Sequence, residues 1–450
     1  MFTQLTLTNF KIWREVHLKL KPITLLLGTN SSGKSSLIQS LLLIRQTVKC
    51  DDPNIDLNLG NPDNQDSVTL GQFQDILCRQ VLNIAGVSKH VGIEFRWTPT
   101  GQIADSVLFS AKYRNGPAGS AELEYLRLGP ETEDHEIKEY YTVQRRKQGV
   151  YALTLADERR SRGQSADFRP EKSFAFSQAA LDRLDKDAKW IKRIGIDLLN
   201  ELNRMIYLGP VRQLAKRDYL WNGRMPTSIG DDGSKAVDAL IASGVAAKKA
   251  RVAKKAAPRE AQLIFETGQW LNKMDLADEL DVKQIGKSSR YALMVKRYGE
   301  TSNLKDVGVG VSQVLPVIVA ALFAKPGHIV IVEEAESHLH PLAQRVLAEL
   351  FASVSKTRNV QFIIETHSEH LFRRMQTLIA KQDIQPEDCG MYFVEREDKR
   401  ATLRELKTNE YGALTNWPDK FFGDAMGETR EQARLMFERQ IQERQANDAM

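Results

Sequence analysis

A short segment rich in glycine and serine near the N-terminus constrains the fold more than any other part of the sequence. Residues 28–35 read GTNSSGKS and match the pattern GxxxxGK[ST], between an apolar run at 23–27 and a helix-like apolar spacing at 36–48. In such a strand–loop–helix context, successive backbone N–H groups surround phosphate oxygens and the helix N-terminus adds positive potential. The segment therefore predicts a phosphate-binding loop in an α/β fold. An ordinary strand-to-helix turn is the alternative.

This loop provides most of the candidate nucleotide-binding residues. We expect Lys34 to reach the β- and γ-phosphates of ATP and the Ser35 hydroxyl to ligate Mg²⁺. The rest of the segment completes the expected ATP site, with Gly28, Thr29, Asn30, Ser31, Ser32, Gly33 and Ser36.

Two carboxylates follow a second apolar run, at residues 329–332. The carboxyl end of a buried parallel strand lies at the same edge of its sheet as a phosphate loop. We expect Glu333 to hold Mg²⁺, through water, and Glu334 to orient or deprotonate the attacking water. A solvated sheet edge is the alternative for both acids.

A third apolar run, at residues 360–364, leads into the segment Glu365, Thr366, His367 and Ser368. At that edge, His367 is expected to donate a hydrogen bond to the γ-phosphate. Because Thr and Ser are good N-cap residues, the segment is also suited to start a helix, and both interpretations can hold at once.

The order of apolar patterns predicts an α/β core that is split in two. Alternating helix and strand patterns indicate a parallel sheet with helical crossovers, and here they run 312–324, 328–333, 341–355, 360–365 and 368–380. Residues 157–170 read as a charged connection, and residues 179–205 are helical in pattern. We expect a core domain formed by 1–85, with the phosphate loop, and 301–410, an inserted β-rich and helical lid region at 86–300, and a tail at 411–450 with a helix at 428–446.

Composition excludes several classes of protein. Sixty-three Lys and Arg against 58 Asp and Glu leave a net charge of +5, and the three cysteines are scattered. Together with the lack of any apolar run near the ~20 residues of a membrane span, this predicts a cytoplasmic chain without membrane contact, disulfides or zinc. Basic clusters at 145–147, 159–162 and 248–255 are candidates for DNA contact, with a solvated surface as the alternative.

The order of these motifs resembles the ABC-type heads of SMC, RecF and OLD proteins within the AAA family of ATPases. The motifs are GTNSSGKS, a long insertion, VGVGVSQ, IVIVEEAESHLHP and ETHSE. The resemblance implies a RecF/SMC-like P-loop head with a mixed sheet, which uses ATP and Mg²⁺ and forms an ATP-sandwich dimer. Each site would then take its signature motif from the other subunit, here Gly310, Ser312 and Gln313. Gln72 or Gln74 would sense Mg²⁺ and the γ-phosphate.

Further segments resemble one branch of OLD-like bacterial ATPases, the family of PtuA from the Septu anti-phage defence system. They are LGQFQDI (70–76), YLGPVRQ (207–213), GVGVSQVLP (308–316), EEAESHLHP (333–341) and WPDKFF (417–422). This resemblance implies an oligomer that regulates a separate HNH nuclease resembling PtuB. The alternatives are a RecF/SMC-like DNA-repair ATPase that acts directly on DNA, and a nucleotide-gated scaffold without turnover. Residues 393–398 resemble part of a Toprim nuclease, but no DxD follows, so a closing β-hairpin of the ATPase is expected there.

Overall fold

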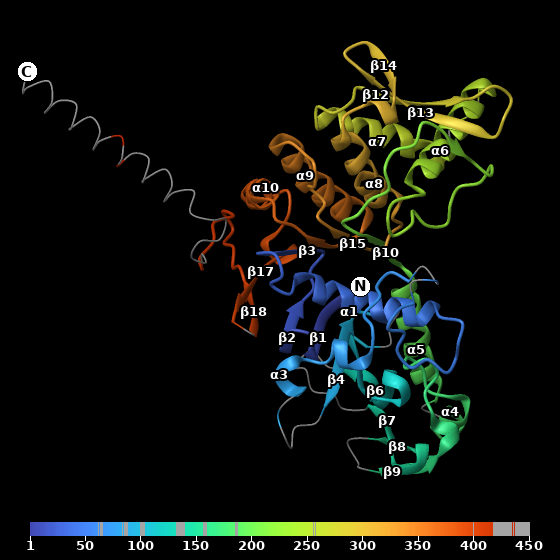
Figure 1. The fold of residues 1–450 in the computed structure, drawn as a ribbon, viewed down its shortest axis with the longest axis vertical. Helices are drawn as coiled ribbons and strands as arrows, with labels where there is room; N and C mark the ends of the chain where they lie inside the picture. The colour runs from blue at the N-terminus through green and yellow to red at the C-terminus, as the bar shows by residue number, and fades with distance from the viewer. Residues whose placement is uncertain are drawn as a thin grey trace, which may run out of the picture.

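A six-stranded sheet runs through the centre of the molecule (Figure 1). The computed structural model describes residues 1–61, 63, 66–82, 84, 89–99, 104–131, 140–155, 160–184, 188–254, 256, 258–398, 400–416, 434 and 436. The strand order is β10 (Met205–Leu208), β15 (Ile329–Glu333), β16 (Gln361–Glu365), β3 (Ile23–Gly28), β17 (Cys389–Glu397) and β18 (Arg400–Glu405). All neighbours are parallel except β17 and β18, which form an antiparallel hairpin. The predicted mixed sheet of an ABC-type P-loop ATPase head is thereby confirmed.

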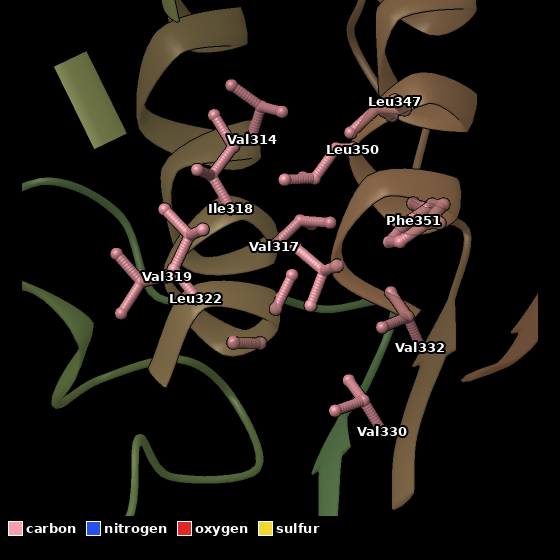
Figure 2. Packing of buried hydrophobic residues seen from close by; sticks show 14 of the residues in the cluster. Val314, Val317, Ile318, Val319, Leu322, Val330, Val332, Leu347, Leu350 and Phe351 are labelled. Atoms are coloured by element: carbon pink, nitrogen blue, oxygen red, sulfur yellow. The ribbon is translucent and has the colours of Figure 1, made fainter. Parts of the chain in front are cut away.

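Helices cover one face of this sheet. They are α8 (Val309–Phe323), α9 (Pro341–Arg358) and α10 (Glu369–Ala380). Figure 2 shows Val314, Val317 and Ile318 of α8 beside Leu350 and Phe351 of α9, with Val330 and Val332 of β15 close by, and all of these belong to one buried cluster. The central strands are buried on both faces, which is why they read as continuous apolar runs.

The other face of the sheet packs against α1 (Lys34–Lys49) and a second sheet. Leu26, Ile331 and Ile363 of the central strands share a buried cluster with Leu41 of α1 and Leu7 of β1. The second sheet is antiparallel and has the order β2 (Trp13–Lys19), β1 (Phe2–Phe10), β4 (His90–Trp97), β5 (Ser106–Asn115), β6 (Ala121–Glu131), β7 (Tyr141–Arg145), β8 (Tyr151–Leu155) and β9 (Arg160–Ser165). The helices α2 (Phe73–Ile76), α3 (Arg79–Leu82), α4 (Gln178–Leu184) and α5 (Ala188–Asn203) accompany it.

A smaller third sheet lies beyond α8, on the side away from the antiparallel sheet (Figure 1). It consists of β11 (Tyr219–Leu220), β13 (Arg290–Arg297), β12 (Glu279–Gln284) and β14 (Glu300–Asn303), with the helices α6 (Ala236–Val252) and α7 (Gln262–Lys273). These helices extend the buried cluster on the α8 side, so this part of the chain packs on the head.

The segment at 86–300 shares sheets with its neighbours on both sides. Strands β4 to β9 continue the sheet that β1 and β2 begin, and β10 pairs with β15 in the central sheet. The region boundaries at 85 and 300 stay a prediction. The helical pattern expected at 179–205 corresponds to α4 and α5, with the start of β10 at Met205, and the connection expected at 157–170 contains β9. Apart from residues 434 and 436, the predicted tail helix and the WPDKFF segment lie outside the described residues. In the part that is described, no helix is long and apolar enough to cross a membrane.

Candidate active site

Three parallel strands end side by side at one edge of the central sheet. Glu333 of β15 pairs with Glu365 of β16, and Glu365 pairs with Leu26 of β3, just before the loop. A pocket of about 500 Å³ opens at this edge. It is lined by Lys11, Ile12, Asn30, Ser31, Ser32, Gly33, Lys34, Ser35, Ser36, Gln39, Glu334, Glu365, His367 and Arg396. The structure therefore brings most of the predicted loop residues together with Glu334 and His367.

The phosphate loop has a backbone that only glycine fits at two positions. Gly28 and Gly33 have φ values of 141° and 119°, in the left-handed region. A Cβ at Gly28 would lie 2.3 Å from the carbonyl oxygen of Val394, and one at Gly33 would lie 2.9 Å from Ile12 Cγ2. The Ser32 hydroxyl is buried, and it has no hydrogen-bond partner among the residues that the structure describes. An open cradle with an unused hydroxyl fits a bound phosphate.

Lys34 and Ser35 both contact Glu365. The Lys34 ammonium donates to the carbonyl oxygens of Gly28 (3.0 Å) and Thr29 (2.8 Å) and lies 3.7 Å from the Glu365 carboxylate. The Ser35 hydroxyl lies 3.1 Å from each oxygen of the same carboxylate. Burial lowers the pKa of Lys34, although the charge of Glu365 opposes this.

The two acids at the strand ends form a carboxyl pair. Burial, followed by the charge of Glu333, raises the pKa of Glu365 to about 7. Burial also raises the pKa of Glu333, whose carboxylate accepts a hydrogen bond of 2.7 Å from the Tyr207 hydroxyl. Oxygen ligands suit Mg²⁺, and the oxygens nearest to Ser35 are those of Glu365, with Glu333 beside it. Glu365 is thus a candidate metal ligand to which the sequence reasoning gave no role.

Gln72 does not approach the pocket lining. It precedes α2 on the surface, and its side chain lies against Gly119 in the turn between β5 and β6. The neighbouring candidate Gln74 is also exposed. The glutamine that the structure brings to the pocket is Gln39 of α1, whose side-chain oxygen accepts a hydrogen bond of 2.6 Å from Lys11.

Glu334 is held at the pocket in a strained conformation. Its φ is +47°, which is uncommon for a residue with a side chain. Its backbone N–H donates to the Glu365 carbonyl oxygen (2.9 Å), and the Ser337 hydroxyl donates to its carboxylate (3.0 Å). These two hydrogen bonds fix the backbone and the carboxylate of Glu334. A carboxylate that orients a water molecule must be held in place in this way.

His367 begins the turn before α10, where Ser368 caps the helix as the sequence indicated. The backbone N–H of His367 donates to the Glu336 carboxylate at 2.6 Å. Burial, and then the charge of Lys34, lower the pKa of the imidazole.

The predicted signature residues lie outside this pocket. Gly310 is in the first turn of α8, where a Cβ would lie 2.9 Å from the His338 carbonyl oxygen. Ser312 and Gln313 are buried, and the Ser312 hydroxyl donates to the Val309 carbonyl oxygen (2.9 Å). Within one chain, the structure does not bring these residues to the phosphate loop.

Two cations in the pocket were missed by the sequence reasoning. Lys11 lies in the turn between β1 and β2, and its side chain lines the pocket. Arg396, at the end of β17, donates to the Ser31 carbonyl oxygen at 3.4 Å. No local pattern marks Arg396, because only the pairing of β17 with β3 carries it to the loop.

Comparison with solved structures finds SMC head domains at low identity. The SMC head bound to the C-terminal winged-helix domain of ScpA is 14% identical, with a TM-score of 0.46, covering 90% of this chain and 97% of that one. The SMC head from Thermotoga maritima is 11% identical, with a TM-score of 0.41 and coverage of 90% and 99%. The head with an extended coiled coil bound to a ScpA domain, from Pyrococcus furiosus, is 12% identical, with a TM-score of 0.45 and coverage of 90% and 96%.

Comparison with protein families gives two matches, whereas no curated protein matches the chain. Residues 384–432 match a family of unknown function, DUF3696. Residues 23–373, most of the chain, match the family described as "AAA domain, putative AbiEii toxin, Type IV TA system". This second match includes the phosphate loop, both strand-end acids and His367, and the protein therefore belongs to this AAA family of P-loop ATPases.

Proposed function

We propose that the protein binds ATP with Mg²⁺ in this pocket and hydrolyses it. The observation that carries the proposal is the convergence of Lys34, Ser35, Glu334, Glu365 and His367 around one opening at the carboxyl ends of three parallel strands. Crevices at that edge of an α/β sheet are where such folds bind nucleotides.

The residues divide the work by charge and position. The loop N–H groups and Lys34 hold the phosphates, with Lys11 and Arg396 as further cations at the opening. Ser35 and Glu365, with Glu333 beside it, would hold Mg²⁺, which neutralises phosphate charge when bound. Glu334 orients the attacking water and accepts its proton, and His367 donates a hydrogen bond to the γ-phosphate.

A second copy of the chain would complete the site through the start of α8. Ser312 and Gln313 are buried. The groups that a partner could reach are therefore the backbone N–H groups around Gly310 and the exposed side chain of Val309. The exposed apolar side chains of Val309, Val211 and Leu214 belong to segments that meet there, since Arg212 contacts Gln313. We infer that ATP draws two copies together over this surface.

The cellular role that we propose is control of an HNH nuclease partner in bacterial anti-phage defence, with DNA contacted by that partner. Support comes from the motifs LGQFQDI, YLGPVRQ and EEAESHLHP, which resemble the PtuA family. ATP then acts partly as a ligand that sets the assembly state, so slow hydrolysis is sufficient. A RecF/SMC-like ATPase that acts on DNA itself is the rival.

Two measurements test this proposal. The first is ATP binding and phosphate release by the purified chain, with and without Mg²⁺. The second is co-purification with an HNH protein encoded in a neighbouring reading frame, followed by plasmid cleavage with and without ATP. Binding, Mg²⁺-dependent release and ATP-sensitive cleavage by the pair are expected. Cleavage by this chain alone, or strong stimulation of hydrolysis by DNA without a partner, would contradict the defence role.

A further inference from the structure

A buried arginine contacts the backbone of the turn that carries Glu334. Arg212 follows β10 in the segment YLGPVRQ, and only 4% of its surface is exposed. One guanidinium nitrogen, Nη2, donates to the carbonyl oxygens of both Glu333 and Glu334 at 2.8 Å. The other, Nη1, donates to the Gln313 carbonyl oxygen at 3.4 Å. The side chain therefore joins the end of β15 to the N-terminal part of α8.

These contacts fall on the strained part of the backbone. The left-handed φ of Glu334 persists only if its surroundings hold the peptides on both sides of it. Arg212 holds the carbonyl groups of these two peptides, and the Glu365 carbonyl oxygen accepts the N–H of the first. The direction of the Glu334 side chain thus depends on Arg212 as well as on its own strand.

The segment that carries Arg212 is itself anchored to the helix of the phosphate loop. The N–H groups of Gly209 and Gln213 donate to the carbonyl oxygens of Asp231 (2.8 Å) and Asp232 (3.0 Å). The Asp231 carboxylate in turn accepts hydrogen bonds of 3.1 and 3.2 Å from Arg45 of α1. The backbone segment that carries the Arg212 guanidinium is therefore fixed to α1. A shift of α8 would move the Gln313 carbonyl oxygen, and with it the guanidinium.

The charge of Arg212 is available at neutral pH. Burial lowers the pKa of Arg212 to about 10, with the charges of Glu336 and Glu334 acting in the opposite direction. Hydrogen bonds from a buried cation to carbonyl oxygens are stronger than those from an exposed one, because little water competes for the donors.

We propose that Arg212 is the positioning residue for Glu334 and couples the orientation of this base to the N-terminal part of α8. The inference rests on the proposed function of Glu334. Since α8 also presents the surface proposed for a second copy, docking there would act on the base through one side chain.

The test compares Arg212→Lys and Arg212→Met with Arg358→Met. Arg358 is a matched control, because it donates to the Leu322 carbonyl oxygen at the opposite end of α8 (2.6 Å) and to Glu266 (2.6 Å), outside the site. A misplaced base costs up to ~100-fold in rate, so we expect both Arg212 variants to lose roughly 10- to 100-fold in kcat. ATP affinity should change by less than about threefold, since the loop is intact. Arg358→Met should lower the Tm but leave kcat unchanged.

A rescue experiment separates positioning from folding. Arg212→Ala leaves a space shaped for a guanidinium, so millimolar guanidinium should restore part of kcat in this variant and none in Arg212→Met, whose side chain fills that space. Arg212→Lys should retain more activity than Arg212→Met, because it keeps the charge but has no fork of donors.

The outcomes separate this inference from the proposed function. Wild-type kcat in the Arg212 variants, or equal losses in kcat and ATP affinity, would overturn the inference alone. A wild-type chain that binds ATP without any hydrolysis would overturn the role of Glu334 as a base, and the inference with it.

Discussion

Among the residues of the candidate site, Glu365 contacts several polar groups at once. It meets Lys34, the Ser35 hydroxyl and Glu333 at the end of β16, and its pKa of about 7 reflects the cost of burying a second carboxylate. A divalent cation would relieve this repulsion, because it favours the charged form of both acids. The local sequence ETHSE does not reveal this role, since it arises only from the pairing of β16 with β15 and β3.

We therefore predict that Glu365→Gln raises the Mg²⁺ concentration needed for half-maximal ATP hydrolysis. Losing one charged oxygen near a metal costs about 10- to 100-fold in metal affinity. A Mg²⁺ titration of phosphate release measures the shift, and Glu369→Gln serves as the control, because the half-buried Glu369 begins α10 and pairs with Arg373 of the same helix. An unchanged Mg²⁺ requirement would assign the metal to other oxygens.

Lys34→Ala and Glu334→Gln should separate binding from turnover. Removing a charged donor to phosphate costs ~10- to 100-fold in affinity, so Lys34→Ala should abolish ATP binding at micromolar concentrations. Glu334→Gln keeps the shape of the side chain but cannot accept the proton. We expect it to bind ATP and to lose ~10²- to 10⁴-fold in turnover. Calorimetry and phosphate release measure the two effects, and normal hydrolysis by Glu334→Gln would remove its assignment as the base.

At the scale of elements, α8 and α9 form the layer that fixes the strand ends from one side. Phe351 of α9 is fully buried and lies against Phe362 of β16, with ring centroids 5.1 Å apart (Figure 2 shows Phe351 beside Leu350). This contact fixes the position of β16 against α9. Because Glu365 is the last residue of β16, the contact also helps to fix the position of its carboxylate.

Phe351→Ala should lower the free energy of unfolding by about 3–5 kcal/mol, because it leaves a cavity in a close-packed layer. Denaturant unfolding measures the change. Phe265→Ala on α7 is the matched control, since that ring is 67% exposed and its loss should cost little. Equal effects of the two substitutions would mean that the ring of Phe351 does not support the layer.

How far the sequence predicted these elements depended on their length and on their partners. The apolar runs of β3, β15 and β16 and the helices α8 to α10 follow from spacing alone, because each is long or doubly buried. β10 was missed: its four residues directly follow a helical pattern, and only its pairing with β15 makes it a strand. The continuation of β1 and β2 into β4–β9 was equally invisible, since no local signal names the partner of a strand.

For the whole molecule, the proposed assembly predicts a change in size with nucleotide. Glu334→Gln with ATP and Mg²⁺ should form dimers or larger oligomers, because the bound nucleotide persists and bridges two copies. Light scattering after size exclusion measures the mass. Introducing Val309→Asp or Leu214→Asp into this variant should keep it monomeric while ATP still binds, whereas Phe265→Asp on the exposed face of α7 should not. Assembly that survives both substitutions would place the interface elsewhere.

The strand that carries the phosphate loop has both of its neighbours near the other end of the chain. β3 lies between β16 and β17, although it belongs to the first thirty residues of the sequence. During synthesis, β3 leaves the ribosome long before either partner exists, and its apolar edges must be shielded while the rest is translated. A nascent chain that has not yet reached β17 does not have both neighbours of β3, so the proposed nucleotide site can form only after residues 389–397 have been translated.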